Sequence, residues 1–148
     1  MARGLMSDTI TVYNCRPVKI GAAIKAQYSK TAITGAMWKE NAGRASSDGK
    51  QLMEKTVSIT IPLEADAQGK SYIAPLLYAA LPPGDESHWT LNADGENPDI
   101  IVLGECPEEI TDSYGIAQLK LGYRAADIKA VSDSTNQRVL PQWKVEAV

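Results

Sequence analysis

The chain has 148 residues, of which 44% are hydrophobic and 22% are charged, and its formal net charge is −3. This size and composition predict one soluble domain over residues 1–148, and the negative charge argues against a strongly basic nucleic-acid-binding protein. No apolar run approaches the roughly 20 residues of a membrane-spanning helix, and the first residues lack the apolar core of a signal peptide. We expect residues 1–7 to form a flexible leader.

The charges are distributed unevenly along the chain. Residues 1–60 contain nine Lys/Arg and four Asp/Glu, whereas residues 61–148 contain six and fourteen. No Lys or Arg occurs between Lys70 and Lys120. Three interpretations stay open: the charges are scattered over a monomer, a basic end of one copy meets an acidic end of the next, or an acidic face repels a negative partner.

The first third of the chain predicts two strands. DTITVYN (8–14) alternates β-branched and polar residues, which is typical of a half-buried strand. TAITGAMWKE (31–40) alternates again, and Gly35 is a candidate β-bulge. Residues 16–30, rich in Lys, Gly and Ala, predict a long loop between the two strands.

The next segment predicts a loop followed by the most regular strand of the chain. NAGRASSDGKQ (41–51) consists largely of Gly, Ser, Asn and Asp, which predicts a loop. MEKTVSITIPLE (53–64) places Val57, Ile59 and Ile61 on one face, and Pro62 limits its hydrogen-bonded ladder.

Residues 71–104 predict a long connection followed by a short buried strand. Three prolines in residues 71–87 leave room for one helical turn at most. Residues 89–91 are expected to be extended, and NADGENPD (92–99) is typical of a polar turn. IIVL (100–103) predicts a buried strand that ends at Gly104.

Residues 106–121 predict the one helix of the fold. Pro107 and the two acidic residues after it suit a helix start, where carboxylates complement the positive end of the dipole. A competing interpretation is a strand over the last part of this segment. The helical spacing joins Ile110, Tyr114, Ala117 and Leu121, whereas the strand alternation joins Ala117, Leu119, Leu121 and Tyr123.

The end of the chain predicts two further strands. ADIKAVSDS (126–134) alternates, and QWKVEAV (142–148) places Trp143, Val145 and Ala147 on one face. The predicted fold class is therefore mainly β: a small β-barrel or sandwich of about six strands with one short helix and long loops.

The motifs of catalytic and nucleotide-binding proteins are absent from the sequence. GRASSDGKQ (43–51) is not a P-loop, because its second glycine comes one residue late and Gln51 replaces the hydroxyl residue. NADGENPD does not match the glycine and glutamate positions of an EF-hand. Glu108 and Glu109 are adjacent, so on a helix they point in different directions.

Single reactive side chains give no further indication of an active site. His88 is the only histidine, and we expect it on a loop or the surface. Cys15 and Cys106 have no CxxC partner, so we expect free thiols, with a disulfide as the alternative. The sequence therefore predicts a protein that is not an enzyme and has no catalytic, cofactor-binding or metal-binding residues.

The three tryptophans are the candidate anchors of the fold or of a partner. Trp38, Trp89 and Trp143 all lie on or beside predicted strands. Large aromatic side chains dominate both protein cores and interface hot spots. We therefore expect core or strand-pairing roles for them, with partner-facing anchors as the alternative.

The order of these segments resembles a known group of phage proteins. The segments are ITVYN, MWKE, a Ser/Asp-rich loop before SITIP, WTL followed by a turn and DIIVLGE, ITDSYGIAQL, and ADIKAVSD followed by a turn and QWKVEAV. From Asp8 to Val148 the chain is similar to head-closure, or head-completion, proteins of the neck of tailed phages. It departs from them at Gln142, where related chains often carry a histidine before the tryptophan, and in its extended segment 16–30.

This resemblance implies a structural virion protein. Such stoppers form rings of six or twelve copies below the portal and adaptor proteins, keep packaged double-stranded DNA in the head and dock the tail. The implied partners are further copies of the chain, the portal or adaptor protein, tail proteins and passing DNA, with no membrane. The implied location is the neck of the virion, after assembly in the cytoplasm of the bacterial host.

The acidic turn then gains a hypothetical role. Because DNA carries about one charge per 1.7 Å, an acidic channel would let it slide. We expect Asp94, Glu96 and Asp99 to face either this channel or a basic neighbouring copy. The alternatives are a tail-terminator or tail-completion ring and, from a different class, a monomeric binding module that uses exposed tryptophans.

Overall fold

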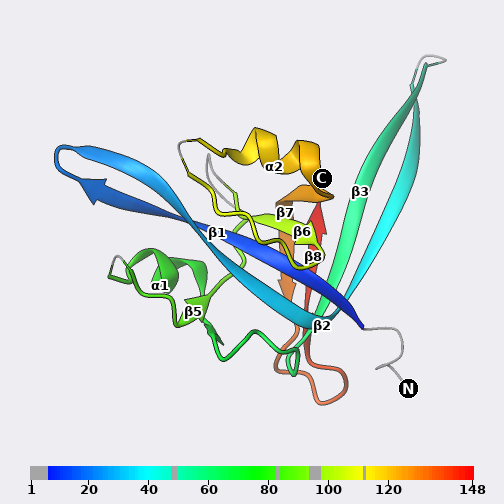
Figure 1. The fold of residues 1–148 in the computed structure, drawn as a ribbon. Coiled ribbons are helices and arrows are strands. Elements are labelled where there is room, and N and C mark those ends of the chain that lie inside the picture. The colour runs from blue at the N-terminus through cyan, green and yellow to red at the C-terminus, as the bar shows by residue number, and fades with distance from the viewer. Residues whose placement is uncertain (1–6, 48–49, 83, 94–97, 112) are drawn as a thin grey trace.

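Six antiparallel strands close into a barrel-like ring in the computed structural model (Figure 1), so the predicted mainly β fold is confirmed. The structure describes residues 7–47, 50–82, 84–93, 98–111 and 113–148, without the side chains of residues 20 and 41–55. The ring closes because β1 pairs with both β2 and β6. In ring order the strands are β1 (Asp8–Ile20), β2 (Ala23–Ser47), β3 (Lys50–Pro62), β8 (Gln142–Ala147), β7 (Ala125–Asp133) and β6 (Ile100–Leu103).

Strands β3 and β8 fill the ring interior with alternate side chains, as their sequences predict. Ile59 pairs with Val145 and Ile61 pairs with Trp143, so the inward faces of the two strands lie in register. All of these side chains are buried, because the period of two in a strand places every second residue on the same face. The inward residues are Val57, Ile59, Ile61, Trp143, Val145 and Ala147.

Residues 10–14 of strand β1 are buried on both faces, so the prediction of a half-buried strand is wrong for them. Ile10 and Val12 join the main core. Tyr13 lies in a second cluster on the opposite face, with Leu119 and Val102. The alternation in the sequence reported only the face toward the main core, because the outer face is covered by segments distant in the chain.

Gly35 forms the β-bulge that the sequence predicts. Asp8 pairs with Ala36 and Thr9 pairs with Thr34, which leaves Gly35 as the extra residue of β2. Its φ of 98° lies in the region that glycine adopts without steric cost. The bulge lets Ile33 and Ala36, three positions apart, both point into the core.

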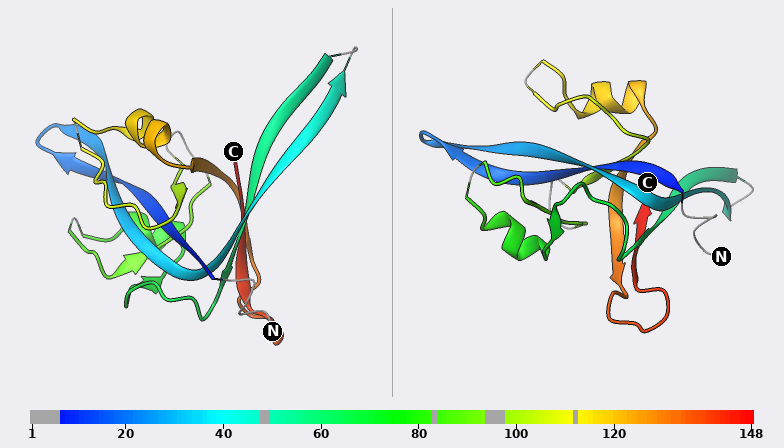
Figure 2. Two further views of the ribbon diagram at one scale, coloured as in Figure 1. Left: turned by 45° about the vertical axis from the view of Figure 1, so that its right-hand side comes forward. Right: turned by 60° about the horizontal axis from the view of Figure 1, so that its bottom comes forward.

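Two β-hairpin arms extend from the ring in different directions (Figures 1 and 2). We define the β1–β2 arm as residues 14–29 and the β2–β3 arm as residues 41–56, where each strand pairs only with its hairpin partner. The sequence predicts loops for most of both segments, and this prediction is wrong for the described residues, which pair as strands on both sides of each turn. In the β1–β2 arm, Gly21 with φ 61° opens a two-residue turn that allows the strands to pair.

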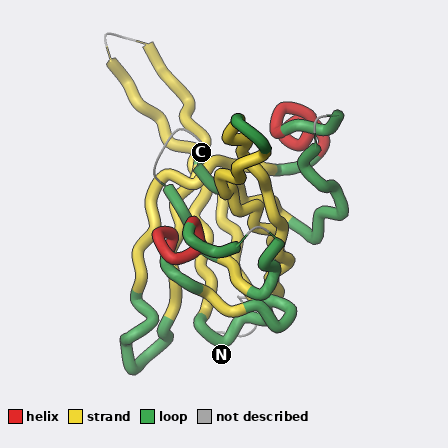
Figure 3. The backbone as a smooth tube through the Cα atoms, turned by 90° about the vertical axis from the view of Figure 1, so that its left-hand side faces the viewer, coloured by secondary structure: helices red, strands yellow, loops and turns green. Residues whose placement is uncertain are grey.

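The two helices are short and lie outside the strands (Figure 3). The first, α1 (Pro75–Ala79), is the helical turn expected among the prolines. The second, α2 (Ile116–Gly122), begins nine residues later than Pro107, so the predicted helix start is wrong. Its first turn is fixed instead at Gly115, whose N–H donates to Gln118 Oε1 at 3.0 Å.

Helix α2 also turns a different face to the protein from the one predicted. Leu119 is fully buried, whereas Leu121 is 89% exposed. Two residues apart on a helix, these side chains point to different sides. A two-stranded parallel sheet, β4 (Ser71–Tyr72) with β5 (His88–Trp89), completes the fold, and no helix of the described chain is long and apolar enough to cross a membrane.

Candidate assembly surfaces

Asp99 lies inside the protein, so its predicted place on an acidic surface is wrong. Its side chain is 0% exposed. Oδ2 accepts hydrogen bonds from Asn14 Nδ2 (2.7 Å) and the Asn92 N–H (3.0 Å), and Oδ1 accepts one from the Cys15 N–H (2.8 Å). Asn14 also bonds both backbone groups of Thr90. The carboxyl group therefore joins β1 to the segment that contains Trp89.

The environment of Asp99 changes its ionisation. Burial raises the pKa of the Asp99 carboxyl group to about 7, although the donors from Cys15, Asn14 and Asn92 act in the opposite direction. The side chain is a structural acceptor rather than a source of surface potential. Asp94 and Glu96 lie outside the described residues, and their predicted role stays a prediction.

Several other carboxylates of the Lys-free and Arg-free interval are engaged within the molecule. Glu109 forms an ion pair with Lys30 at 3.4 Å, and Glu108 Oε1 accepts a hydrogen bond from Tyr123 at 3.3 Å. Asp85 accepts hydrogen bonds from both the hydroxyl and the N–H of the neighbouring serine, which lowers its pKa to about 2. The acidic interval is therefore not one free face, because part of its charge holds loops in place.

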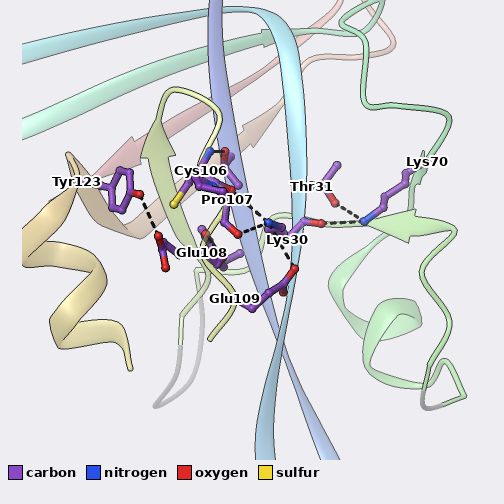
Figure 4. A network of polar contacts seen from close by, with 10 residues as sticks. Lys30, Thr31, Lys70, Cys106, Pro107, Glu108, Glu109 and Tyr123 are labelled. Atoms are coloured by element: carbon purple, nitrogen blue, oxygen red, sulfur yellow. Dashed lines mark hydrogen bonds and ion pairs between the residues drawn. The ribbon is translucent and has the colours of Figure 1, made fainter. Parts of the chain in front are cut away.

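Lys30 ties the root of the β1–β2 arm to the loop before α2 (Figure 4). Its Nζ donates to the Pro107 carbonyl at 2.7 Å and pairs with Glu109. Lys70 reaches the same strand from the other side, because its Nζ donates to the Lys30 carbonyl at 2.9 Å and to Thr31 Oγ1 at 3.0 Å. Burial lowers the pKa of Lys70. These contacts hold the arm root against two separate segments.

Helix α1 supports the same root. Arg16 is only 3% exposed, and its guanidinium group lies 5.2 Å from the ring centre of the buried Tyr78. This geometry is a cation–π contact. The root of the β1–β2 arm is therefore fixed to the body of the protein, and the arm leaves it in a defined direction (Figure 1).

The tip of the β1–β2 arm, residues 17–27, contrasts with its root. Ile24 is 76% exposed, and Lys19 is exposed beside it on the partner strand, where the two residues pair. No Asp or Glu occurs between Asp8 and Glu40, so the arm carries only positive charge. A two-stranded hairpin alone is marginally stable in water, and this tip carries an exposed apolar side chain beside exposed positive charge.

A groove of about 960 Å³ lies at a different end of the ring. It is formed where the bulge of β2, the segment after β3 and the loop between β7 and β8 meet. Leu63 and Leu140 line it and are 49% and 55% exposed, and the exposed carboxylates Glu64 and Asp66 also line it. Leu140 has a φ of 52°, a conformation that leucine rarely adopts.

Two of the three tryptophans are core residues. Trp89 and Trp143 are 3% and 5% exposed, and their ring centres lie 5.2 Å apart in an edge-to-face arrangement. Tyr72 packs against both rings. Trp38 is half-buried against the core, and its Nε1 donates to Glu40 Oε1 at 3.3 Å. The core interpretation holds for Trp89 and Trp143, which have no surface to offer a partner.

The side chains around His88 do not have the geometry of a catalytic triad. Ser87 Oγ (3.0 Å) and Asp85 Oδ1 (3.4 Å) both approach Nδ1 of His88. A relay needs the serine and the carboxylate on opposite ring nitrogens. Cys15 and Cys106 are free thiols, as expected, and among the residues that the structure describes no three His, Cys, Asp or Glu side chains group to bind a metal.

Fold and surfaces together define a small, mainly β protein whose six strands close into a ring, with two projecting β-hairpin arms and a groove lined by apolar and acidic side chains. The chain belongs to DUF6751, a family of unknown function whose model matches residues 5–148. No curated protein matches the chain, and neither does any solved structure.

Neither the β1–β2 arm nor the groove was predicted from the sequence. The arm could have been found from Gly21, since a glycine between two short extended runs predicts a two-residue hairpin turn. The groove had no signal in the sequence, because its lining comes from three segments that only the fold brings together.

Proposed function

We propose that this protein is a structural component of the head-to-tail connector of a tailed phage, where copies form a ring that closes the DNA-filled head and docks the tail. The observation that carries the proposal is the pair of β-hairpin arms. Both arms project from the ring, past the point where their strands pair with any other strand. Arms of this kind suit a subunit that reaches its neighbours. The segment order that resembles head-completion proteins supports the same conclusion.

A ring subunit needs two different surfaces, because head-to-tail contacts repeat one face against another until the ring closes. The β1–β2 arm is basic and partly apolar, and the groove is apolar and acidic. The pair therefore meets this requirement within one chain. The resemblance suggests six or twelve copies, with the portal or adaptor protein on one side and tail proteins on the other.

The proposed passage of DNA rests on fewer residues than the sequence predicted. Asp99 is buried and makes no contribution to a channel surface. Asp94 and Glu96 stay candidates for an acidic channel wall that repels the DNA backbone. Reversal of both charges to lysine should increase DNA retention or slow ejection.

The burial of Trp89 and Trp143 weighs against a monomeric binding module. That alternative depends on exposed tryptophans, and only Trp38 keeps a partly exposed ring. A tail terminator would also form a ring but would lie at the end of the tail. The phenotype of a deletion mutant therefore separates the connector function from the tail-terminator function.

Deletion of the gene from the phage genome, with complementation in trans, tests the proposed function. We expect packaged heads that lose DNA and carry no tails when examined by electron microscopy. Filled heads beside overlong free tails would instead support the tail-terminator function. Infectious, normally tailed particles would contradict both.

A further inference from the structure

The tip of the β1–β2 arm and the groove have complementary chemistry. The tip presents Ile24 and the cationic Lys19, and the groove presents Leu63 and Leu140 beside the carboxylate of Glu64. An apolar side chain gains by leaving water, and opposite charges at the rim select the register of the contact. The two surfaces therefore have apolar side chains that can pack together and charges of opposite sign.

The arm cannot fill the groove of its own chain. The root is held by Lys30 and Arg16, so the arm leaves the body in a fixed direction. Figures 1 and 2 show its tip on the opposite side of the molecule from the loop between β7 and β8, which forms one wall of the groove. The tip of a second copy can supply the occupant that the chain's own tip cannot.

We infer that the tip of the β1–β2 arm of one copy docks in the groove of a second copy. Ile24 enters between Leu63 and Leu140, and Lys19 lies near Glu64. The contact joins two different faces, so a pair of copies keeps one free arm and one free groove, and a chain of copies grows until it closes. The inference rests on the proposed ring and names the contact that builds it.

The mass of the purified protein as a function of concentration tests the contact. We expect the wild type to exceed its monomer mass of 16.0 kDa progressively as its concentration rises. Ile24→Asp and Leu63→Asp should each weaken self-association about 10- to 100-fold, since each removes an apolar side chain that the proposed contact would bury. Leu121→Asp, on a leucine of α2 that is 89% exposed, is the control and should leave the mass unchanged.

Charge reversal gives a second, gentler test that does not disturb folding. Lys19→Glu and Glu64→Lys should each weaken self-association about 2- to 5-fold, and the double variant should recover it. A wild type that stays monomeric up to millimolar concentration overturns the inference. So does self-association that Ile24→Asp and Leu63→Asp leave unchanged.

A mixed disulfide locates the contact directly. Ile24→Cys on a chain with one affinity tag is mixed with Leu63→Cys on a chain with another, and the mixture is mildly oxidised. We expect a disulfide dimer that carries both tags, and none when either variant is mixed with the wild type. Absence of the mixed dimer in an associating sample overturns the inference.

The inference and the proposed function fail in different experiments. Crosslinked copies together with a deletion phage that still makes infectious particles would keep the arm contact and reject the neck function. Unlinked copies together with leaking, tailless heads would keep the neck function and reject this contact.

Discussion

Replacement of Asp99 tests whether this residue is an internal acceptor. In Asp99→Ala the Cys15 N–H and the Asn92 N–H each lose an acceptor, whereas Asn14 Nδ2 keeps its bond to the Thr90 carbonyl at 2.6 Å. A buried donor without its acceptor costs about 1–3 kcal/mol. Both hydrogen bonds are part-buried, so each loss lies in the lower half of this range, and we expect a decrease of about 3 kcal/mol in the free energy of unfolding at pH 5.5.

Urea unfolding followed by tryptophan fluorescence measures this decrease, because Trp89 and Trp143 are buried in the folded protein. For a chain of this length the change corresponds to a midpoint temperature lower by about 6–12 °C. Asp99→Asn keeps one acceptor oxygen and should lose about half as much. Glu105→Ala, an exposed carboxylate nearby in the sequence, should change stability by less than about 0.5 kcal/mol. A loss below about 1 kcal/mol for Asp99→Ala would refute the reasoning.

The raised pKa of Asp99 predicts the direction in which the stability of the protein changes with pH. Burial raises the folded-state pKa of Asp99 from 3.8 to about 7. Between these values the folded state holds a proton that the unfolded state has released, so stability from this group falls as the pH rises. It is fully present below about pH 4 and lost by about pH 7. The stability advantage of the wild type over Asp99→Asn should therefore shrink across this range, and an advantage that grows with pH would contradict the assignment.

Three further substitutions test the fold. Gly35→Ala should cost about 1–2 kcal/mol in thermal unfolding, because the bulge holds φ at 98°; an unchanged midpoint would exclude strain at this position. Ile59→Ala removes a core side chain that is 1% exposed and should cost about 2–5 kcal/mol by urea unfolding, against less than about 0.5 kcal/mol for the exposed Leu121→Ala. Lys30→Ala deletes the 2.7 Å hydrogen bond to the Pro107 carbonyl and should speed amide hydrogen exchange in residues 104–111; unchanged exchange there would show that the arm root is held without it.

The ring strands were predictable where burial of one face of the strand requires apolar residues at every second position. Val57, Ile59 and Ile61 alternate because they fill the barrel interior, and β8 alternates for the same reason. Gly35 was predictable as a bulge because a glycine inside a strand pattern has few other uses. These features depend on neighbours in the sequence and on burial alone.

The arms were not predictable from composition. Residues 16–30 and 41–51 contain the Gly, Ala, Ser and Lys typical of loops, yet residues 16–20, 23–30, 41–47 and 50–51 pair as strands because each has a complementary strand beside it. Strand formation depends on pairing and packing more than on intrinsic preference. The prediction of a helix start at Pro107 was wrong for a similar reason. The Cys106 N–H donates to Thr11 Oγ1, and this contact with β1 fixes the segment around Pro107 as a loop.

The burial of Asp99 was also not predictable from the sequence. It follows Pro98 in a polar turn, which predicts exposure, but two of its donors are supplied by residues 14 and 15. Contacts between residues more than 80 positions apart leave no periodic signal in a single sequence. The groove was not predictable for a similar reason, since Gly35, Leu63 and Leu140 meet only in the folded chain.

Localisation of the protein in purified phage particles tests the central claim most directly. An epitope tag fused after Val148, whose side chain is 58% exposed, is detected with gold-labelled antibody in the electron microscope. We predict gold at the junction of head and tail, in particles that keep their infectivity. Gold on the capsid faces or at the distal tail tip, or tagged protein absent from particles, would contradict the account.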